Sequence, residues 1–347
     1  MKDTALQQRP AYPAPRLGKY HDVETALDFG DPAGELAALR SQCGVFELSW
    51  RAKITVAGKD RVRWLHNMVT NNVRDLAVNH GAYNFVLNAQ GRILGDIYIY
   101  NRGESLLLDT DRAQVEPLMA AMKRFIIMDK VEMNAVGAIR SIGICGPRAG
   151  DALASAGLDA DGLEPLEIRE LKLDDLAVSV VRGPENKPGW YEVWTDSASP
   201  APSIQERLTA AGARPAGVEA LELWRVLQGI PHYGQDIRER DLPQETGQSQ
   251  ALSFTKGCYI GQEIVERIRS RGQVHRKFTG FEFPGDAPVP GKYDSEGRTI
   301  AEVTSLASIT AEKKIGLGYV RREVAEAGPD VDLGGHKARI VELPFVI

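Results

Sequence analysis

The stretch Lys256-Gly257-Cys258-Tyr259-Ile260-Gly261-Gln262-Glu263 has the most distinctive local chemistry in the chain. Its thiol lies between two glycines, two residues after a lysine, and helical spacing of apolar residues begins at Glu263. Glycine adopts backbone conformations that other residues avoid, so this pattern predicts a tight turn into a helix N-terminus. Two interpretations of Cys258 remain open here. A helix N-terminus and a nearby ammonium favour a reactive thiolate, but free cysteines are also often small buried residues.

Length and composition indicate a globular protein with more than one folding unit. A chain of 347 residues exceeds one ordinary core, so we expect two or three domains. The apolar fraction of 43% and the charged fraction of 26% are typical of soluble proteins. The net charge of −5 argues against a general nucleic-acid binder, and no apolar run reaches the roughly 18 residues of a membrane helix. We expect a cytoplasmic protein with no membrane partner and no specific nucleic-acid partner, in which residues 1–19 form a flexible arm.

The cysteines and histidines predict neither a disulfide framework nor a metal site. Cys43, Cys145 and Cys258 are odd in number, far apart and free of any C-x-x-C pair. The six histidines are scattered and form no H-x-x-x-H or H-E-x-x-H pattern.

A β-hairpin is the clearest prediction for the first half of the chain. Residues 83–87 and 92–100 alternate as strands around a turn that ends at Gly91. Asp96 lies inside the second strand, where aspartate is disfavoured, so it is either a solvent-facing strand position or part of a site.

The remaining spacing predicts mixed helices and strands, an α+β class. We expect helices in six stretches of the first two thirds: two short ones within 21–42, then 60–68, 114–125, 151–156, 204–211 and 218–230. Short strands with turn punctuation after residue 277 predict a small all-β barrel or sandwich.

Several motifs together resemble the glycine-cleavage T-protein superfamily, and specifically its YgfZ-type folate-binding branch. The opening stretch resembles the K-G-C-[FY]-x-G-Q-E signature of that branch in full. Residues 223–236, LWRVLQGIPHYGQD, are similar to the superfamily's L-R-x-E-x-G-x-P-x-Y-G-x-D stretch, and residues 91–96, GRILGD, to its G-R-I-x-x-D turn. The similarity extends from about Asp22 to the C-terminus.

The resemblance implies three domains around a central opening that binds tetrahydrofolate. These are an N-terminal α+β folate-binding domain over 20–135, completed by 220–272, a second α+β domain over 136–219, and a C-terminal β-barrel over 273–347. It also implies roles for individual residues, with Asp96 beside the reactive folate nitrogen and Glu192 holding the pterin. The other folate-site positions that it implies are Tyr83, Tyr100, Arg225 and Tyr233.

The chemistry of these side chains fits such a ligand. The carboxylate of Glu192 can accept both hydrogen bonds from the donor-rich edge of a pterin, and Tyr83 or Tyr100 can pack against its ring. Arg225 is the expected electrostatic partner of the anionic glutamyl tail.

The sequence also departs from the transferases of this superfamily. Gly95 replaces the first of their two consecutive aspartates, and residues 183–189 replace their G-Y-T-G-E stretch. The transferases also lack the cysteine of the K-G-C signature.

We therefore expect a tetrahydrofolate-binding accessory protein for iron–sulfur cluster assembly or repair, which would act with cluster-assembly proteins or client enzymes. Cys258 would be its reactive thiol, although one cysteine cannot hold a cluster alone. The alternative is a folate-dependent aminomethyltransferase in which Asp96 assists proton transfer. A third reading is a scaffold that has kept the fold without the ligand.

Overall fold

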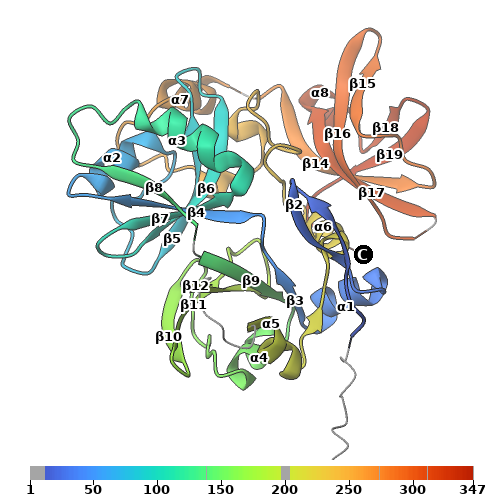
Figure 1. The fold of residues 1–347 in the computed structure, drawn as a ribbon. Helices are drawn as coiled ribbons and strands as arrows, with labels where there is room; N and C mark the ends of the chain where they lie inside the picture. The colour runs from blue at the N-terminus through green and yellow to red at the C-terminus, as the bar shows by residue number, and fades with distance from the viewer. Residues whose placement is uncertain (1–11, 138, 197–203, 273, 311, 347) are drawn as a thin grey trace, which may run out of the picture.

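Four β-sheets account for the strands of the computed structural model, which describes residues 12–137, 139–196, 204–272, 274–310 and 312–346 (Figure 1). One sheet is the hairpin of β1 (Arg16–Tyr20) and β2 (Val23–Asp28), and the others have five, six and six strands. Helices pack against their faces, so the fold mixes α and β elements, as the spacing predicted.

The five-stranded sheet is antiparallel and has the order β5-β6-β7-β4-β8. Its strands are β4 (Arg51–Ala57), β5 (Gly81–Leu87), β6 (Ile93–Asn101), β7 (Leu106–Asp111) and β8 (Glu132–Val136). Apolar residues on one face, such as Ile54 and Ile99, pack against α2 (Arg61–Met68) and α3 (Val115–Lys123), which follows the short helix η1 (Arg112–Gln114). Because side chains alternate along a strand, the charged residues of β4 and β7 lie on the opposite face.

The second sheet has the order β10-β11-β12-β9-β3-β13. Its strands are β3 (Gly44–Glu47), β9 (Ile139–Cys145), β10 (Ile168–Leu173), β11 (Leu176–Arg182), β12 (Trp190–Asp196) and β13 (Arg214–Pro215). Helices α4 (Ala149–Ser155) and α5 (Ile204–Ala210) contribute Leu153 and Leu208 to the core on one face. Tyr100 of the first sheet packs with Trp194 of the second, so the inner faces of the two sheets meet.

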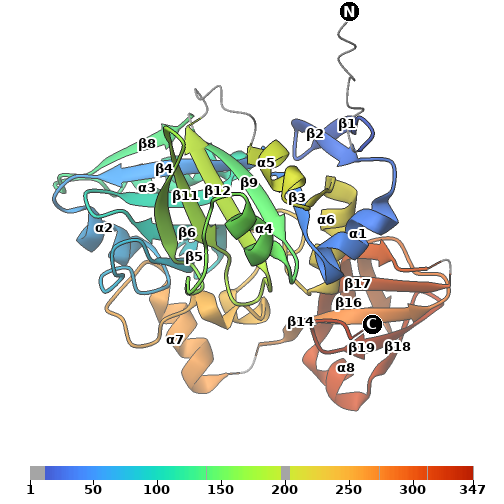
Figure 2. The ribbon, with the colours of Figure 1, turned by 90° about the horizontal axis from the view of Figure 1, so that it is seen from below.

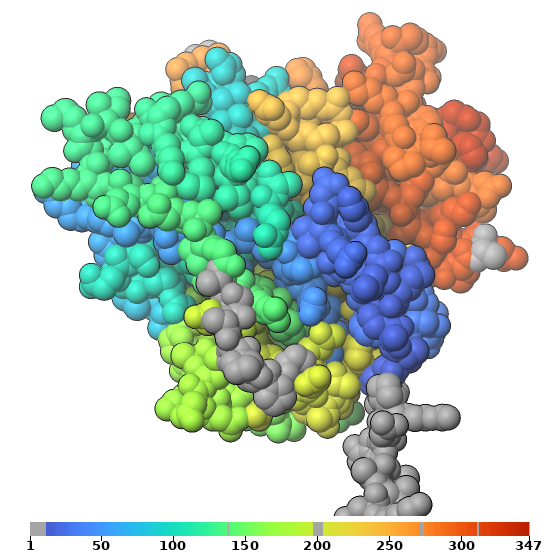
Figure 3. Space-filling view, in the orientation of Figure 1, coloured from blue at the N-terminus to red at the C-terminus, as the bar shows by residue number. Residues whose placement is uncertain are grey.

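Helix α6 (Val218–Leu227) connects the other parts of the molecule. Its Trp224 packs with residues of the second sheet, and its Val226 packs with the C-terminal sheet. Helix α1 (Pro32–Ser41) and the β1–β2 hairpin lie beside it (Figure 2). In the space-filling view the hairpin, in dark blue, lies at the surface between the first sheet and the C-terminal sheet (Figure 3).

The segment after α6 contains η2 (Pro243–Glu245), η3 (Ser249–Ala251) and α7 (Gln262–Arg271). The C-terminal sheet follows, with the order β15-β16-β17-β14-β19-β18. Its elements are β14 (Arg276–Pro284), β15 (Gly291–Ser295), β16 (Arg298–Ser308), β17 (Lys313–Arg321), α8 (Arg322–Ala327), β18 (Asp330–Leu333) and β19 (His336–Val341).

Two local predictions are wrong. The first helix expected within residues 21–42 is β2, which pairs with β1 through a turn at His21 and Asp22, two residues with positive φ. The arm expected over residues 1–19 contributes β1, and its residues 1–11 lie outside the described part of the chain. In addition, β3 lies outside the range 136–219 and yet pairs with β9, so sheet membership crosses the expected boundary.

Two features are absent from the described residues. None of their helices combines the length and the apolar character that a membrane span requires. No group of three or more His, Cys, Asp or Glu side chains among them is arranged to hold a metal ion.

Candidate functional site

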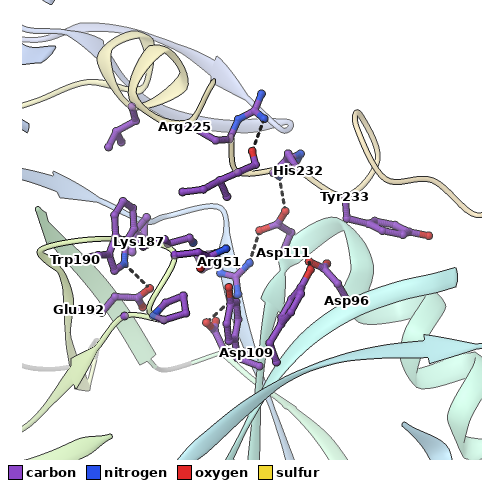
Figure 4. Close-up of a pocket in the computed structure, with 18 of the residues that line it drawn as sticks. Arg51, Asp96, Asp109, Asp111, Lys187, Trp190, Glu192, Arg225, His232 and Tyr233 are labelled. Atoms are coloured by element: carbon purple, nitrogen blue, oxygen red, sulfur yellow. Dashed lines mark hydrogen bonds and ion pairs between the residues drawn. The ribbon is translucent and has the colours of Figure 1, made fainter. Parts of the chain in front are cut away.

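A pocket lies where the inner faces of the first two sheets meet α6 and the loop that follows it (Figure 4). Strands β4, β6 and β7, the β11–β12 loop and residues 230–233 all contribute to its lining. The structure places six of the seven predicted site residues in this lining: Tyr83, Asp96, Tyr100, Glu192, Arg225 and Tyr233. The exception is Cys258.

Asp96 is held in a fixed orientation at this pocket. The Tyr83 hydroxyl donates to its Oδ2 at 2.8 Å, and Gln114 Nε2 donates to its Oδ1 at 2.8 Å. The backbone N–H of Asp96 in turn donates to Gln114 Oε1 at 3.0 Å. Burial and the Asp96 charge raise the pKa of Tyr83 well above its usual value, so Tyr83 stays a neutral donor. The half-buried carboxylate of Asp96 is therefore positioned rather than freely rotating.

Glu192 is held by two indole groups on the opposite side of the pocket. Trp194 Nε1 donates to its Oε2 at 2.8 Å, and Trp190 Nε1 lies 3.3 Å from its Oε1. Each carboxylate oxygen has more than one acceptor position, so both oxygens can still accept a ligand N–H. Tyr100 packs edge-on against Trp194, with ring centroids 5.2 Å apart.

A buried ionic cluster forms the floor of the pocket, and the sequence reasoning missed it. Arg51 binds Asp109 at 2.8 Å and Asp111 at 2.7 Å, and Lys53 binds Asp109 at 2.6 Å. The pairing of β4 with β7 places Arg51 opposite Asp111 and Lys53 opposite Asp109. The sequence did contain a signal for this cluster. Each of the two strand-like stretches carries two charged residues two positions apart, and such residues share one face of a sheet.

The charges of the cluster stabilise one another. Burial alone would raise the pKa of Asp109, but Arg51 and Lys53 bring the net shift below its usual range. His232 Nε2 lies 2.7 Å from Asp111 Oδ2, and this contact raises the pKa of His232 although burial opposes it. The ring of His232 also stacks on His21 at the tip of the β1–β2 hairpin, with centroids 4.3 Å apart. His232 therefore joins the floor of the pocket to the hairpin that covers it.

Arg225 does not have the freedom that the expected role in binding a ligand tail requires. Its Nε and Nη2 donate to Glu222, its Nη1 donates to Ile230 O at 2.9 Å and Asp236 at 2.6 Å, and its Nη2 also donates to Ser305 at 3.1 Å. All five N–H groups of the guanidinium are thus used within the protein. The side chain ties α6 to the following loop and to the C-terminal sheet.

Tyr233 contributes part of the pocket wall. Its hydroxyl donates to Leu94 O at 2.8 Å, which fixes the 230–233 segment against β6. Its half-buried ring lines the pocket and can contact a ligand, whereas its hydroxyl already donates to Leu94.

Cys258 lies outside this pocket, on the protein surface. It is exposed, so the alternative of a small buried residue is wrong. The turn forms as predicted, with Gly261 at φ +82° before α7. Lys256, however, points away into the end of α2, where Nζ donates to the carbonyls of His66, Val69 and Asn71 at 2.5, 2.6 and 2.9 Å. The lysine of the signature therefore anchors the loop that presents Cys258.

The comparisons with known proteins all point to one protein family. Residues 10–256 match the family described as the GCVT N-terminal domain. The chain is 30% identical to an aminomethyltransferase of Rubrobacter xylanophilus over 99% of this chain and 94% of that protein. It is 24% identical to a putative chloroplastic transferase of Arabidopsis thaliana, over 95% and 77% of the two chains.

A solved structure shows the same fold. The glycine cleavage system aminomethyltransferase T of Bartonella henselae superposes with a TM-score of 0.82 at 20% identity, over 96% of this chain and 94% of that one. The motifs, the family match over more than half of the chain and the shared fold agree. The chain therefore belongs to the GCVT N-terminal domain family, within the glycine-cleavage T-protein superfamily.

Proposed function

We propose that this protein binds tetrahydrofolate in the central pocket and transfers to it the carbon of an aminomethyl group from a carrier, which releases ammonia and the free carrier and forms methylenetetrahydrofolate. The observation that carries this proposal is the pair of positioned carboxylates, Asp96 and Glu192, that face one pocket. The relatives named aminomethyltransferase favour this activity over the iron–sulfur role that we expected from the K-G-C signature.

The residues present fit the ligand. Glu192 can accept from the amino and ring N–H groups of a pterin, and Tyr98 and Tyr100 offer aromatic surface beside it. Asp96 is held by Tyr83 and Gln114 and has the chemistry to take a proton from a folate amine as that nitrogen bonds to carbon. The tail partner that we expected at Arg225 is not available, because its donors are used.

The rate of such a reaction would come mainly from positioning. The ligand amine and the carbon donor would be held beside an oriented carboxylate, which lowers the entropic cost of their meeting. Gly95 and residues 183–189 differ from the transferases, but Asp96 keeps its orientation through Gln114.

Formation of methylenetetrahydrofolate from an aminomethylated carrier protein tests the activity. We expect turnover above background that Asp96→Asn lowers by at least about 10²-fold. Turnover that is absent in the wild-type protein, or equal in Asp96→Asn, contradicts the proposal.

A second function is favoured by the surface position of Cys258. We infer from the K-G-C signature that the chain is of the YgfZ type, and an exposed free thiol on an anchored loop suits contact with another protein. The protein would then support iron–sulfur cluster assembly or repair together with assembly proteins or client enzymes. Rescue of cluster-enzyme activity in cells lacking the native protein tests this. Full rescue by Cys258→Ala rules out a role for the thiol.

We further propose that the chain is divided into three domains. It comprises 20–135 with 220–272, then 136–219, then 273–347, and β3 is the exception that joins the sheet of the second unit. Limited proteolysis that yields fragments with these ends would support it.

A further inference from the structure

Lys187 is half-buried and differs from the two buried lysines, Lys53 and Lys256, because its amine has no acceptor within the described residues. Lys53 Nζ binds Asp109, and Lys256 Nζ donates to three carbonyls. Lys187 lines the pocket, and in the described part of the chain no oxygen is hydrogen-bonded to its Nζ. Its only direct partners there are two aromatic rings, Trp190 at 4.9 Å and Tyr98 at 5.8 Å from the ring centroids.

The β11–β12 loop is built to aim this amine into the pocket. Gly183 N donates to Trp190 O at 2.8 Å, and Lys187 N donates to Pro184 O at 2.9 Å, which closes the loop on itself. Gly189 has φ +65°, and a Cβ there would lie 2.5 Å from Gly146 O. A larger residue at position 189 would displace the loop. The position of the Lys187 backbone is therefore fixed by the loop, and its side chain lines the pocket over the Trp190 ring.

Lys187 and Glu192 converge on the same indole. The amine lies over the Trp190 ring, and the Glu192 carboxylate lies beside the Nε1 of that ring (Figure 4). Burial and the nearby Arg51 lower the pKa of Lys187, although the charges of Glu192, Asp109 and Asp111 act in the opposite direction. A donor with unused N–H groups thus lies near an acceptor with unused lone pairs.

This arrangement complements one edge of a pterin ring. That edge carries an amino group and a ring N–H, which donate, followed by the 4-oxo oxygen, which accepts. We propose that Lys187 donates to the 4-oxo oxygen while Glu192 accepts from the two donors, so that Lys187 selects 4-oxo over 4-amino pteridines. This inference rests on the proposed binding of tetrahydrofolate in the pocket.

The selection has a simple physical origin. A 4-amino group presents N–H donors to the donor at Lys187, so the amine is left desolvated and unpaired. A hydrogen bond that involves a charged group is worth enough to give a preference of about tenfold to one hundredfold. Methionine at position 187 has similar length and no donor, so it removes the contribution of Lys187 to the preference. Arginine keeps donors there.

The test is calorimetric titration with tetrahydrofolate and with tetrahydroaminopterin, which differ at position 4 of the ring. The proteins are the wild type, Lys187→Met, Lys187→Arg and, as the matched control, Lys172→Met at an exposed lysine of β10 in the same sheet. We expect the wild type, the control and Lys187→Arg to bind tetrahydrofolate at least about tenfold more tightly than the 4-amino compound. Lys187→Met should narrow this ratio by weakening tetrahydrofolate binding. The preference that remains comes from Glu192, because a 4-amino ring has no N–H at position 3 to donate to the carboxylate.

The outcomes separate the two proposals. An equal ratio of affinities in the wild type and Lys187→Met overturns the role of Lys187 and leaves folate binding intact. If the wild type binds neither compound, the proposed function fails. Thermal unfolding of each variant shows that it is folded before titration.

Discussion

Gln114 binds Asp96 through both ends of its amide and occupies the space beside Gly95. Its Nε2 donates to Asp96 Oδ1 at 2.8 Å, and its Oε1 accepts from Asp96 N at 3.0 Å. A Cβ at position 95 would lie 2.7 Å from Gln114 Oε1. The glycine that departs from the transferase pattern is therefore the residue that makes room for the side chain orienting Asp96.

Asp96→Asn should lower kcat by about 10²- to 10⁴-fold, because an amide cannot take the proton from the folate amine. KM should change little if the carboxylate acts in the chemical step. Steady-state formation of methylenetetrahydrofolate measures both constants. A variant that changes KM alone would assign Asp96 to binding.

Gly95→Ala should displace Gln114 and lower kcat, and it should cost about 1–3 kcal/mol of stability because the added methyl group overpacks the core. A double-mutant cycle with Gln114→Ala checks the cause. If the methyl group acts through Gln114, the two losses of kcat are less than additive. Additive losses would show that Gly95 acts independently of Gln114.

Asp109→Asn should destabilise the protein by about 3–5 kcal/mol, because Lys53 and Arg51 would keep buried charges without their shared carboxylate. Urea unfolding measures this loss. Asp286→Asn is the matched control, since the ion pair of Asp286 with Lys314 lies at the surface and its removal should have no measurable effect. Equal unfolding midpoints for Asp109→Asn and the wild type would contradict this account of the cluster.

His66 should make stability depend on pH between about pH 6.5 and pH 4. Burial, together with the charges of Lys256 and Arg74, lowers the pKa of His66 to about 4 in the folded protein. The unfolded state therefore binds the extra proton in this window, and the free energy of unfolding falls as the pH is lowered. In His66→Asn the side-chain oxygen can replace Nδ1 as acceptor for Val73 N, so the fold should persist. Parallel pH profiles for the wild type and this variant would be inconsistent with the predicted effect.

The fold could be predicted from the sequence where the apolar residues follow a single period, either that of a strand or that of a helix. The hairpin of β5 and β6 was confirmed because its alternation surrounds a turn at Gly91 with φ +70°. Strand β2 was mistaken for a helix because Val23 and Leu27 are four residues apart, which suits a helix, and only pairing with β1 decides between the two. Strand β10 was not predicted, because its alternating charges gave no clear apolar pattern.

The sequence predicted less of the site than of the fold. Asp96 and Glu192 were identified from the family resemblance. The partners that satisfy Arg225 include Asp236 and Ser305, and Ser305 is 80 residues away, so no local pattern could reveal them. The orientation of Lys187 depends on loop closure, which spacing does not report. Contacts between distant segments decided each of these outcomes.

The most direct test of the central claim is calorimetric titration of the wild type and Glu192→Gln with tetrahydrofolate. Glutamine can accept only one of the two pterin hydrogen bonds and presents an N–H group to the other donor, so binding should weaken by at least about tenfold. Trp190 and Trp194 contact Glu192 and should report the same binding through their fluorescence. The account predicts saturable binding at one site in the wild type and this loss in Glu192→Gln. Absence of binding in the wild type, or equal affinity in the two proteins, would contradict it.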